Sequence, residues 1–411
     1  MPVGKVLARQ SSRVAQKVAS KFSDRDRLTQ FLILLAAGCL TTMTGGVVAP
    51  VFPEMVQELQ LDPRWAGMLV STHALTSALA TPLMGMLADR TSKLRVLLGG
   101  LICYAVVGVL TPLMPTLALL IPMRGLLGVT SGAIAAATIG ILGSLYEGSQ
   151  RSRILGYATS TMTTSAILFP LLGGWAGETN WQGAFYLYGL GLPLALVAAT
   201  RLRVPPTKSD AGIQTDRSSL SVIWKNATIL RTYLLVAAAA TVVYAVVIYT
   251  PLYLKETIGA GPELNGVVLA IRAVGAAVTS AFFASRLAQR FGKRGAIAFG
   301  FSLMALTIFT IPFLTHLVWI IPTAILFGVG FGILTPNLYD CLAEVSPPET
   351  RTTILAIATG FNSLGQFICP ILLGPVWKYI GLSSVFYGAA VLAAIACAVS
   401  LAKPQKQPQE A

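Results

Sequence analysis

The chain has 411 residues, of which 55% are hydrophobic and only 11% are charged, and its mean hydropathy is +0.71. This composition excludes an ordinary soluble globular protein and predicts an all-α integral membrane protein. The net charge of +14 does not indicate a nucleic-acid-binding protein, because the basic residues are expected in membrane loops rather than on one face of a soluble domain.

Residues 1–28 are predicted to form a basic cytoplasmic arm. No apolar core precedes Phe31, and the segment therefore lacks the pattern of a secretory signal peptide. Basic residues at four-residue spacing would line one side of a helix that lies on anionic lipid. A disordered tail and an organelle transit peptide are the alternatives. The basic residues are Lys5, Arg9, Arg13, Lys17 and Lys21.

Twelve apolar runs follow, each about long enough to cross a bilayer as a helix. The runs are 29–51, 66–88, 95–114, 117–145, 154–177, 184–200, 229–253, 264–288, 295–315, 317–342, 354–377 and 382–401. They predict an N-terminal six-helix half (29–200), a cytoplasmic linker (201–228), a C-terminal six-helix half (229–401) and a cytoplasmic tail (402–411). Within the linker, the stretch SLSVIWKN is expected to form a short interfacial helix.

The loops predict the orientation of these spans. Assigned alternately to the two sides, they place 25 Lys and Arg residues on the side of both termini and three on the other. The excess of basic residues in cytoplasmic loops predicts a multi-pass cell-membrane protein with both termini in the cytoplasm. Five tryptophans are then expected at the outer interface, where an indole lies between lipid and water. They are Trp65, Trp175, Trp181, Trp319 and Trp377.

The two halves repeat each other in sequence. GMLADRTSKLR at 85–95 and SRLAQRFGKR at 285–294 share Leu, Ala, Arg and Lys at an offset of two hundred residues. The same offset, without a gap, relates residues farther along, such as Gly128 and Gly328. A duplicated six-helix unit is predicted, with a charged hinge between the second and third helix of each copy.

This organisation resembles the major facilitator superfamily of secondary transporters over nearly the whole chain. The hinge motif of that family reads Gly-x-Leu-Ala-Asp-Arg-x-Gly-Arg-Lys, and the first hinge matches it at Gly85, Leu87, Ala88, Asp89, Arg90 and Lys93. The second hinge has Gln289 in place of the acid and keeps Arg290, Gly292 and Lys293. The resemblance implies a gating hinge that closes the inner gate in one state and releases it in the other. A topology anchor alone is the alternative.

The fourth helix carries a second resemblance. Arg124, followed four residues later by Gly128, is similar to the fourth-helix motif of the family, although Leu127 replaces its usual Gln. An arginine two turns into a spanning helix costs at least about 2.5 kcal/mol and therefore needs a partner or a wet cavity. We expect Arg124 to handle substrate or protons, or else to tie its helix to a neighbour.

The fifth helix carries a third resemblance. Pro170, Gly173 and Gly174 match part of the signature of the drug:proton antiporter branch, although Ser165 and Phe169 replace its other two glycines. The end of the first helix, VVAPVFPEM, resembles the same branch. The resemblance implies that the fifth helix packs closely across the two halves and takes part in gating rather than in ligand contact.

Polar residues inside the spans are the candidates for transport chemistry. Residues proposed for transport or proton coupling are Arg124, Asp340, His73 and Arg272. Residues proposed for the substrate cavity are Tyr244, Tyr249, Asn337, Asn362 and Gln366. His73 and Arg272 are expected to face each other across the cavity or to belong to the outer gate. A hydrogen-bonded core histidine and an arginine that snorkels to the interface are the alternatives.

Helices 1 and 7 contain no carboxylate, which bears on both coupling and substrate. Proton coupling is therefore assigned to Asp340 or Asp89, modulated by Arg124, with His73 as a further candidate. A centre without carboxylates favours a neutral or anionic substrate over a dication, because an apolar cavity offers a cation only aromatic ring faces.

No zinc-protease motif, nucleophile elbow or phosphate-binding loop occurs, and no enzyme activity, cofactor or metal site is predicted. The five cysteines lie in apolar runs and are interpreted as small hydrophobes. We expect a single-chain transporter that works by alternating access and exports amphiphilic drugs or metabolites in exchange for protons. A sugar or metabolite facilitator without proton coupling, and a non-transporting membrane receptor or scaffold, are the alternatives.

Overall fold

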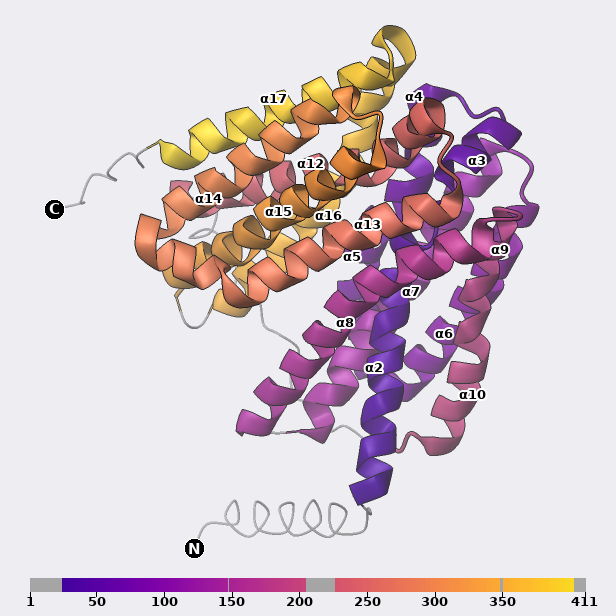
Figure 1. Ribbon diagram of the computed structural model, residues 1–411. Coiled ribbons are helices and arrows are strands. Elements are labelled where there is room, and N and C mark those ends of the chain that lie inside the picture. Colours follow the sequence, from indigo (N-terminus) through magenta and orange to yellow (C-terminus); the bar gives the residue numbers. More distant parts are fainter. Residues whose placement is uncertain (1–23, 147, 205–225, 348–349, 403–411) are drawn as a thin grey trace, which may run out of the picture.

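The computed structural model describes residues 24–146, 148–204, 226–347 and 350–402. Most of the predicted basic arm, the predicted interfacial helix of the linker and most of the predicted tail lie outside these residues. Within them the chain is helical apart from turns and short loops, and the predicted all-α fold is confirmed (Figure 1).

The helices follow the predicted order, with short helices added at the turns. In the N-terminal half they are α2 (Asp24–Gly46), α3 (Phe52–Glu58), α4 (Pro63–Ala66), α5 (Met68–Arg90), α6 (Lys93–Leu110), η1 (Thr111–Leu113), α7 (Leu117–Leu145), α8 (Gly148–Gly177), α9 (Gln182–Tyr186), η2 (Leu187–Leu190) and α10 (Gly191–Arg201). In the C-terminal half they are α12 (Ala227–Ile258), α13 (Pro262–Phe282), α14 (Ala284–Thr310), η3 (Ile311–Phe313), α15 (Leu317–Val345), α16 (Arg351–Ile380) and α17 (Leu382–Leu401).

Among the described residues, ten helical segments are long and apolar enough to cross a membrane. The long helices α5 and α8 complete the twelve predicted spans, although they carry more polar side chains. α5 packs against α16, and α8 packs against α13, which places both along the interface between the halves. Their hydroxyl and imidazole groups therefore face protein or a cavity instead of hydrocarbon, where they would be costly.

The two halves lie against each other at one end and diverge toward the other (Figure 1). The joined end, here called the closed end, holds α3, α4, α9 and the start of α13. The other end, here called the hinge end, holds the hinge residues Thr91, Ser92 and Gly292 and both termini of the described chain. The molecule thus has the shape of a V whose mouth lies at the hinge end.

Equivalent glycines set the helix packing inside each half. A Cβ at Gly128 of α7 would lie 2.4 Å from the carbonyl oxygen of His73 in α5. A Cβ at Gly328 of α15 would lie 2.1 Å from the carbonyl oxygen of Arg272 in α13. No side chain fits at either place, and glycine is what lets each helix pair touch backbone to backbone. The same contact two hundred residues apart supports the predicted duplication.

The structure departs from the sequence predictions at four places. The chain turns after Gly46, inside the predicted first span, and forms α3. The sixth span is divided into α9, η2 and α10. The second hinge is a kink inside α14, where Gly292 has a φ of 74° that favours glycine, whereas Ser92 of the first hinge is extended. Trp181, expected at the lipid interface, is buried because its Nε1 donates to Glu58 at 2.9 Å.

Candidate functional site

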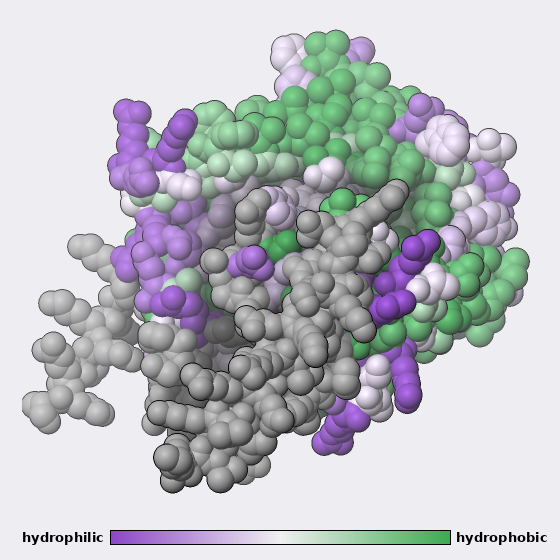
Figure 2. All heavy atoms as spheres, turned by 90° about the horizontal axis from the view of Figure 1, so that it is seen from below, coloured by the Kyte–Doolittle hydropathy of each residue, from purple (hydrophilic) through white to green (hydrophobic). Residues whose placement is uncertain are grey.

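A cavity of about 740 Å³ lies between the two halves. Side chains from α2, α5 and α8 line it on one side, and side chains from α12, α13, α15 and α16 line it on the other. The lining extends from His73 and Leu269 to Ser280 and Tyr339 near the hinge end. From below, Figure 2 shows apolar side chains on the flanks of the bundle and a hollow with hydrophilic residues beside it. The volume fits a drug-sized ligand.

Two ion pairs between the halves seal the closed end. Nζ of Lys255 in α12 lies 3.1 Å from Oε1 of Glu54 in α3, and Nζ of Lys378 in α16 lies 2.6 Å from Oδ2 of Asp62 before α4. Burial raises the pKa of Glu54, against the opposing effect of Lys255. The hydrogen bond from Lys378 lowers the pKa of Asp62. The cavity is therefore blocked at this end.

Sequence reasoning missed both pairs, although a signal was present. Only three basic residues were assigned to the outer loops, and two of them, Lys255 and Lys378, belong to the C-terminal half. Two acids of the N-terminal half, Glu54 and Asp62, lie in the sequence between the first and second predicted spans, which is an outer loop in the same assignment. When one half carries acids and the other half carries bases at the same end of the bundle, these side chains are candidates for ion pairs that hold that end closed.

The predicted packing motif of α8 lies at a close approach of the two halves. A Cβ at Gly174 would lie 2.4 Å from the carbonyl oxygen of Pro262 at the start of α13. A Cβ at Gly173 would lie 2.5 Å from the backbone of Val47, just after α2. Pro170, one turn away, lines the cavity. These contacts add backbone packing to the ion pairs at the closed end.

Tyr249 is not among the described residues that line the cavity, contrary to expectation. Its ring is fully buried and packs edge to face against Trp377, with the ring centroids 5.8 Å apart. A Cβ at Gly67 of the N-terminal half would lie 3.4 Å from its hydroxyl oxygen. The two tyrosines leave α12 in different directions, because Tyr249 points toward the closed-end seal and Tyr244 points into the cavity.

Arg124 is fully buried inside the N-terminal half and does not line the cavity. Its Nε donates to the carbonyl oxygen of Leu69 at 2.7 Å, its Nη1 to the hydroxyl of Tyr188 at 3.1 Å, and its Nη2 to the carbonyl oxygen of Thr44 at 2.8 Å. Nη2 also lies 3.4 Å from Nδ1 of His73. These contacts tie α7 to α5, η2 and α2, so that Arg124 reaches the cavity only through His73.

Two other predicted cavity residues do line it. Tyr244 and His73 converge on Gly45 of α2, where a Cβ would lie 3.1 Å from Cε1 of His73 and 3.4 Å from the Tyr244 hydroxyl. Gln366 of α16 also lines the cavity, and its Nε2 donates to Oδ1 of Asn362 at 2.7 Å. Asn362 therefore supports Gln366 from behind.

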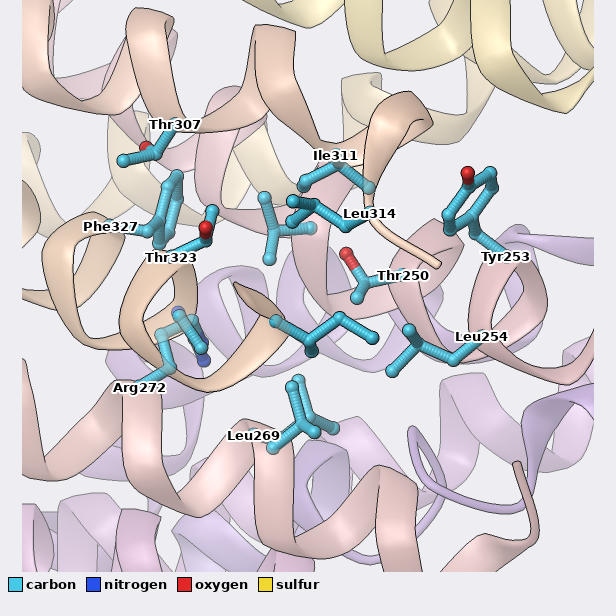
Figure 3. Close-up of a pocket in the computed structure, with 14 residues that line it drawn as sticks. Thr250, Tyr253, Leu254, Leu269, Arg272, Thr307, Ile311, Leu314, Thr323 and Phe327 are labelled. Atoms are coloured by element: carbon cyan, nitrogen blue, oxygen red, sulfur yellow. The ribbon is translucent and has the colours of Figure 1, made fainter. Parts of the chain in front are cut away.

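Arg272 of α13 lines the cavity, as His73 of the N-terminal half does. Its Nε is buried without a hydrogen-bond partner among the described residues. Its Cζ lies 5.9 Å from the ring centroid of Phe327 in α15. Arg272 also borders a small pocket inside the C-terminal half, where its guanidinium group extends from α13 toward Phe327 and Thr323 (Figure 3).

The two hinge lysines pair with acids from different places. In the first hinge, Nζ of Lys93 lies 3.9 Å from Oδ1 of Asp89, and both residues belong to the hinge. In the second hinge, Lys293 pairs with Asp340 and Glu344 of α15. Both hinges thus contain a lysine that is paired with an acid. In the first hinge the acid belongs to the hinge itself, and in the second hinge the acids belong to a neighbouring helix.

This pairing places Asp340 at the hinge end, where its side chain is 58% exposed, and Asp340 is not among the described cavity residues. Asn337, one turn before it, is also outside the cavity, since its Nδ2 donates to the carbonyl oxygens of Ile333 and Ala284 at 2.7 and 3.4 Å. Of the remaining hinge residues, Arg90 is exposed, Gly85 is half-buried and Arg290 lies over the ring of Phe291 at 5.6 Å.

The family model described as "Major Facilitator Superfamily" matches residues 34–370 and 253–411 of the chain. The chain belongs to this superfamily. It is a transporter rather than an enzyme. The transporter is 21% identical over 350 residues to the quinolone resistance protein NorA of Staphylococcus aureus (strain COL), covering 82% of this chain and 89% of NorA. It is 22% identical over 359 residues to multidrug resistance protein 1 of Bacillus subtilis (strain 168), covering 87% and 92%.

Solved structures share the fold of this transporter. A bacterial homologue of the human lysosomal transporter Spinster, in an inward-facing and unoccupied conformation, superposes with a TM-score of 0.79 at 17% identity, covering 92% of this chain and 97% of that one. A mutant of the nucleoside transporter NupG superposes with a TM-score of 0.79 at 13% identity, covering 91% and 100%. Both likenesses support the predicted twelve-helix architecture.

Proposed function

We propose that this transporter exports amphiphilic drugs or metabolites across the cell membrane, in exchange for protons, by alternating access. The observation that carries the proposal is the cavity of about 740 Å³ between the two halves, bounded at one end by inter-half ion pairs and backbone contacts. Its lining combines apolar side chains with a few polar ones, which suits an amphiphile. The names of the two relatives, a quinolone resistance protein and a multidrug resistance protein, support a drug-like substrate.

We place the hinge end and both termini in the cytoplasm and expect a single chain to be the working unit. The 25 Lys and Arg residues on the side of the termini, against three on the other, support this orientation. In that orientation the cavity faces the cytoplasm and receives substrate for export. The closed end then has to open for release.

A second candidate is a facilitator without proton coupling. It is favoured by one observation: among the described residues that line the cavity there is no carboxylate. Of the proton-coupling candidates Asp340, Asp89 and His73, His73 is the one found among the described residues that line the cavity. Asp89 and Asp340, paired with lysines at the hinge end, are proposed to act on gating instead.

Uptake by proteoliposomes separates these functions. The purified chain is reconstituted with an acidic lumen, and neutral, anionic and cationic amphiphilic dyes are added outside. Proton-coupled export predicts that at least one dye accumulates above its equilibrium level and is released by a protonophore. If the dye only equilibrates across the membrane, to the same level with and without the protonophore, the protein is a facilitator. Dye entry no faster than into protein-free liposomes would contradict both candidates.

A further inference from the structure

Arg272 is a half-buried cation that has no hydrogen-bond or ion-pair partner among the described residues. Its Nε is shielded from solvent. Arg124, the other arginine within the spans, has a partner for each of its three nitrogens. An unpaired charge at membrane depth costs at least about 2.5 kcal/mol, which marks the residue as functional rather than structural.

The rest of the cavity wall leaves this charge uncompensated. The described residues that line the cavity include no Asp or Glu, and its other titratable side chains are those of His73, Tyr244 and Tyr339, of which Tyr244 interacts with Arg272. The weak contact of Cζ with the Phe327 ring, at 5.9 Å, does not use the hydrogen-bonding capacity of the guanidinium group. The wall therefore offers donors and positive charge to whatever enters, surrounded by apolar side chains.

We propose that Arg272 binds the anionic group of the transported compound, and that the preferred substrates are therefore amphiphiles carrying a carboxylate or a similar oxyanion. This inference rests on the proposed function, because it names the substrate class of the same cavity. A guanidinium group presents a planar pair of donors that matches the two oxygens of a carboxylate. The apolar lining, with Met162, Val243 and Phe331, then holds the hydrophobic part of the compound.

A competing account is that one water molecule satisfies Arg272. The small pocket behind it, bordered by Thr250 and Thr323, measures about 30 Å³, and the hydroxyl of Thr250 has no partner among the described residues (Figure 3). A pocket of that size has room for a water molecule. The two accounts differ in outcome, because a hydrated arginine with a purely structural role gives the cavity no preference for anions.

Binding measured without transport tests the proposal. Wild type, Arg272→Met and Arg272→Lys are placed in lipid nanodiscs, and fluorescence titrations are made with dansylaminoundecanoic acid and with its uncharged carboxamide. Arg286→Met is the matched control, because it removes one exposed arginine outside the cavity. Empty nanodiscs supply the background.

Wild type and Arg286→Met are expected to bind the acid at least about tenfold more tightly than the amide, the size of one charge-assisted contact. Arg272→Met should bind both compounds equally, with the amide affinity unchanged, and Arg272→Lys should keep part of the preference. Equal binding of acid and amide by wild type would overturn the proposal. An undiminished preference for the acid in Arg272→Met, or in Arg272→Gln if the Met variant does not fold, would overturn it as well.

The result is independent of the liposome experiment. If no dye is transported but Arg272-dependent binding of the acid is found, the proposed function fails and the anion site stands. If dyes are transported and no preference for the acid is found, the anion site fails and the proposed function stands.

Discussion

Arg124 and Arg272 are both arginines within spanning helices, but their surroundings differ. This difference indicates different functions for the two side chains. Arg124 binds the backbone of α2 and α5 and the Tyr188 hydroxyl, all inside the N-terminal half. We propose that it affects transport by fixing these helices and the position of His73. Arg272 binds nothing in the described part of the protein and is left for the substrate.

Replacing Arg124 is therefore expected to lower stability. Arg124→Leu removes three donors and leaves the Tyr188 hydroxyl and two carbonyl oxygens short of a partner, at a net cost of about 2 kcal/mol. The melting temperature should fall by roughly 4–8 °C. It is measured in a background where Cys39, Cys103, Cys341 and Cys397 are replaced, with a thiol-reactive dye that reports exposure of Cys369, which is fully buried in the folded chain. Arg272→Leu loses no hydrogen bond and should melt within about 2 °C of wild type; equal losses in both variants would contradict the assignment.

For single residues, the sequence predicts how deep a side chain lies in the membrane better than it predicts which way the side chain points from its helix. His73, Arg272, Tyr244 and Gln366 line the cavity, whereas Tyr249 faces the closed-end seal. The physical reason is that the spanning helices are apolar on nearly every face. The face that packs against another helix is then as apolar as the face that contacts lipid. Helical periodicity therefore gives little information about the orientation of each helix about its own axis.

The two hinges show what the internal repeat adds at the scale of helices. Gly140 in α7 is the repeat equivalent of Asp340 in α15, and a Cβ at Gly140 would lie 3.4 Å from Cδ of Lys93. Lys293 meets Asp340 at the equivalent place. The position that contacts the hinge lysine is therefore the same in the two copies, and in the second copy it carries the acid that pairs with Lys293.

The contact of α3 with α12 makes the closed end sensitive to pH. Burial raises the pKa of Glu54 in this state, and opening would hydrate the carboxyl group and return its pKa toward the ordinary value of 4.5. The closed state, in which the pKa of Glu54 is raised, binds the proton more tightly than the open state. The resulting stabilisation of the closed state is fully present below pH 4.5 and is lost as pH rises through the raised pKa. Asp62 acts in the opposite sense, but only below its ordinary value of 3.8.

Acidification from about pH 7.5 to about pH 5 should consequently favour the closed state. The expected change is measured as the distance between spin labels on cysteines introduced at Thr179 and Thr257, which are exposed on opposite halves at the closed end. The fraction of long distances should fall as pH falls. Glu54→Gln cannot change its charge at this position and should lose the response to pH; a response as large as that of wild type would assign the effect to another group.

The arrangement of the whole molecule follows from the sequence only in part. Length, hydropathy and the duplication predicted twelve spans in two halves, because a bilayer requires long apolar helices whatever their packing. The angle between the halves was not predictable. It depends on close approaches such as that of Gly174 to Pro262 and on the ion pairs of Lys255 and Lys378, and another state of the same helices would replace these contacts.

If alternating access is the mechanism, the closed end must separate once in each cycle. Asp62→Cys and Lys378→Cys, introduced together after the five natural cysteines are replaced, put thiols at two positions whose native side chains touch at 2.6 Å. A short, reducible bifunctional thiol reagent should join them and lower dye transport more than about tenfold, because substrate still enters from the hinge end but has no exit. Binding of the dansyl acid should persist in the joined protein, since the cavity of about 740 Å³ lies away from the linked residues.

Reduction of the linkage should restore transport, and each single-cysteine variant treated with the same reagent should transport at the untreated rate. These controls separate the effect of joining the halves from the loss of the Asp62–Lys378 ion pair, which both treated and untreated double variants lack. Undiminished transport by fully cross-linked protein would mean that the closed end never opens there. The substrate would then need a path to the far side that does not pass between the halves, and rocking of the two halves would no longer account for transport.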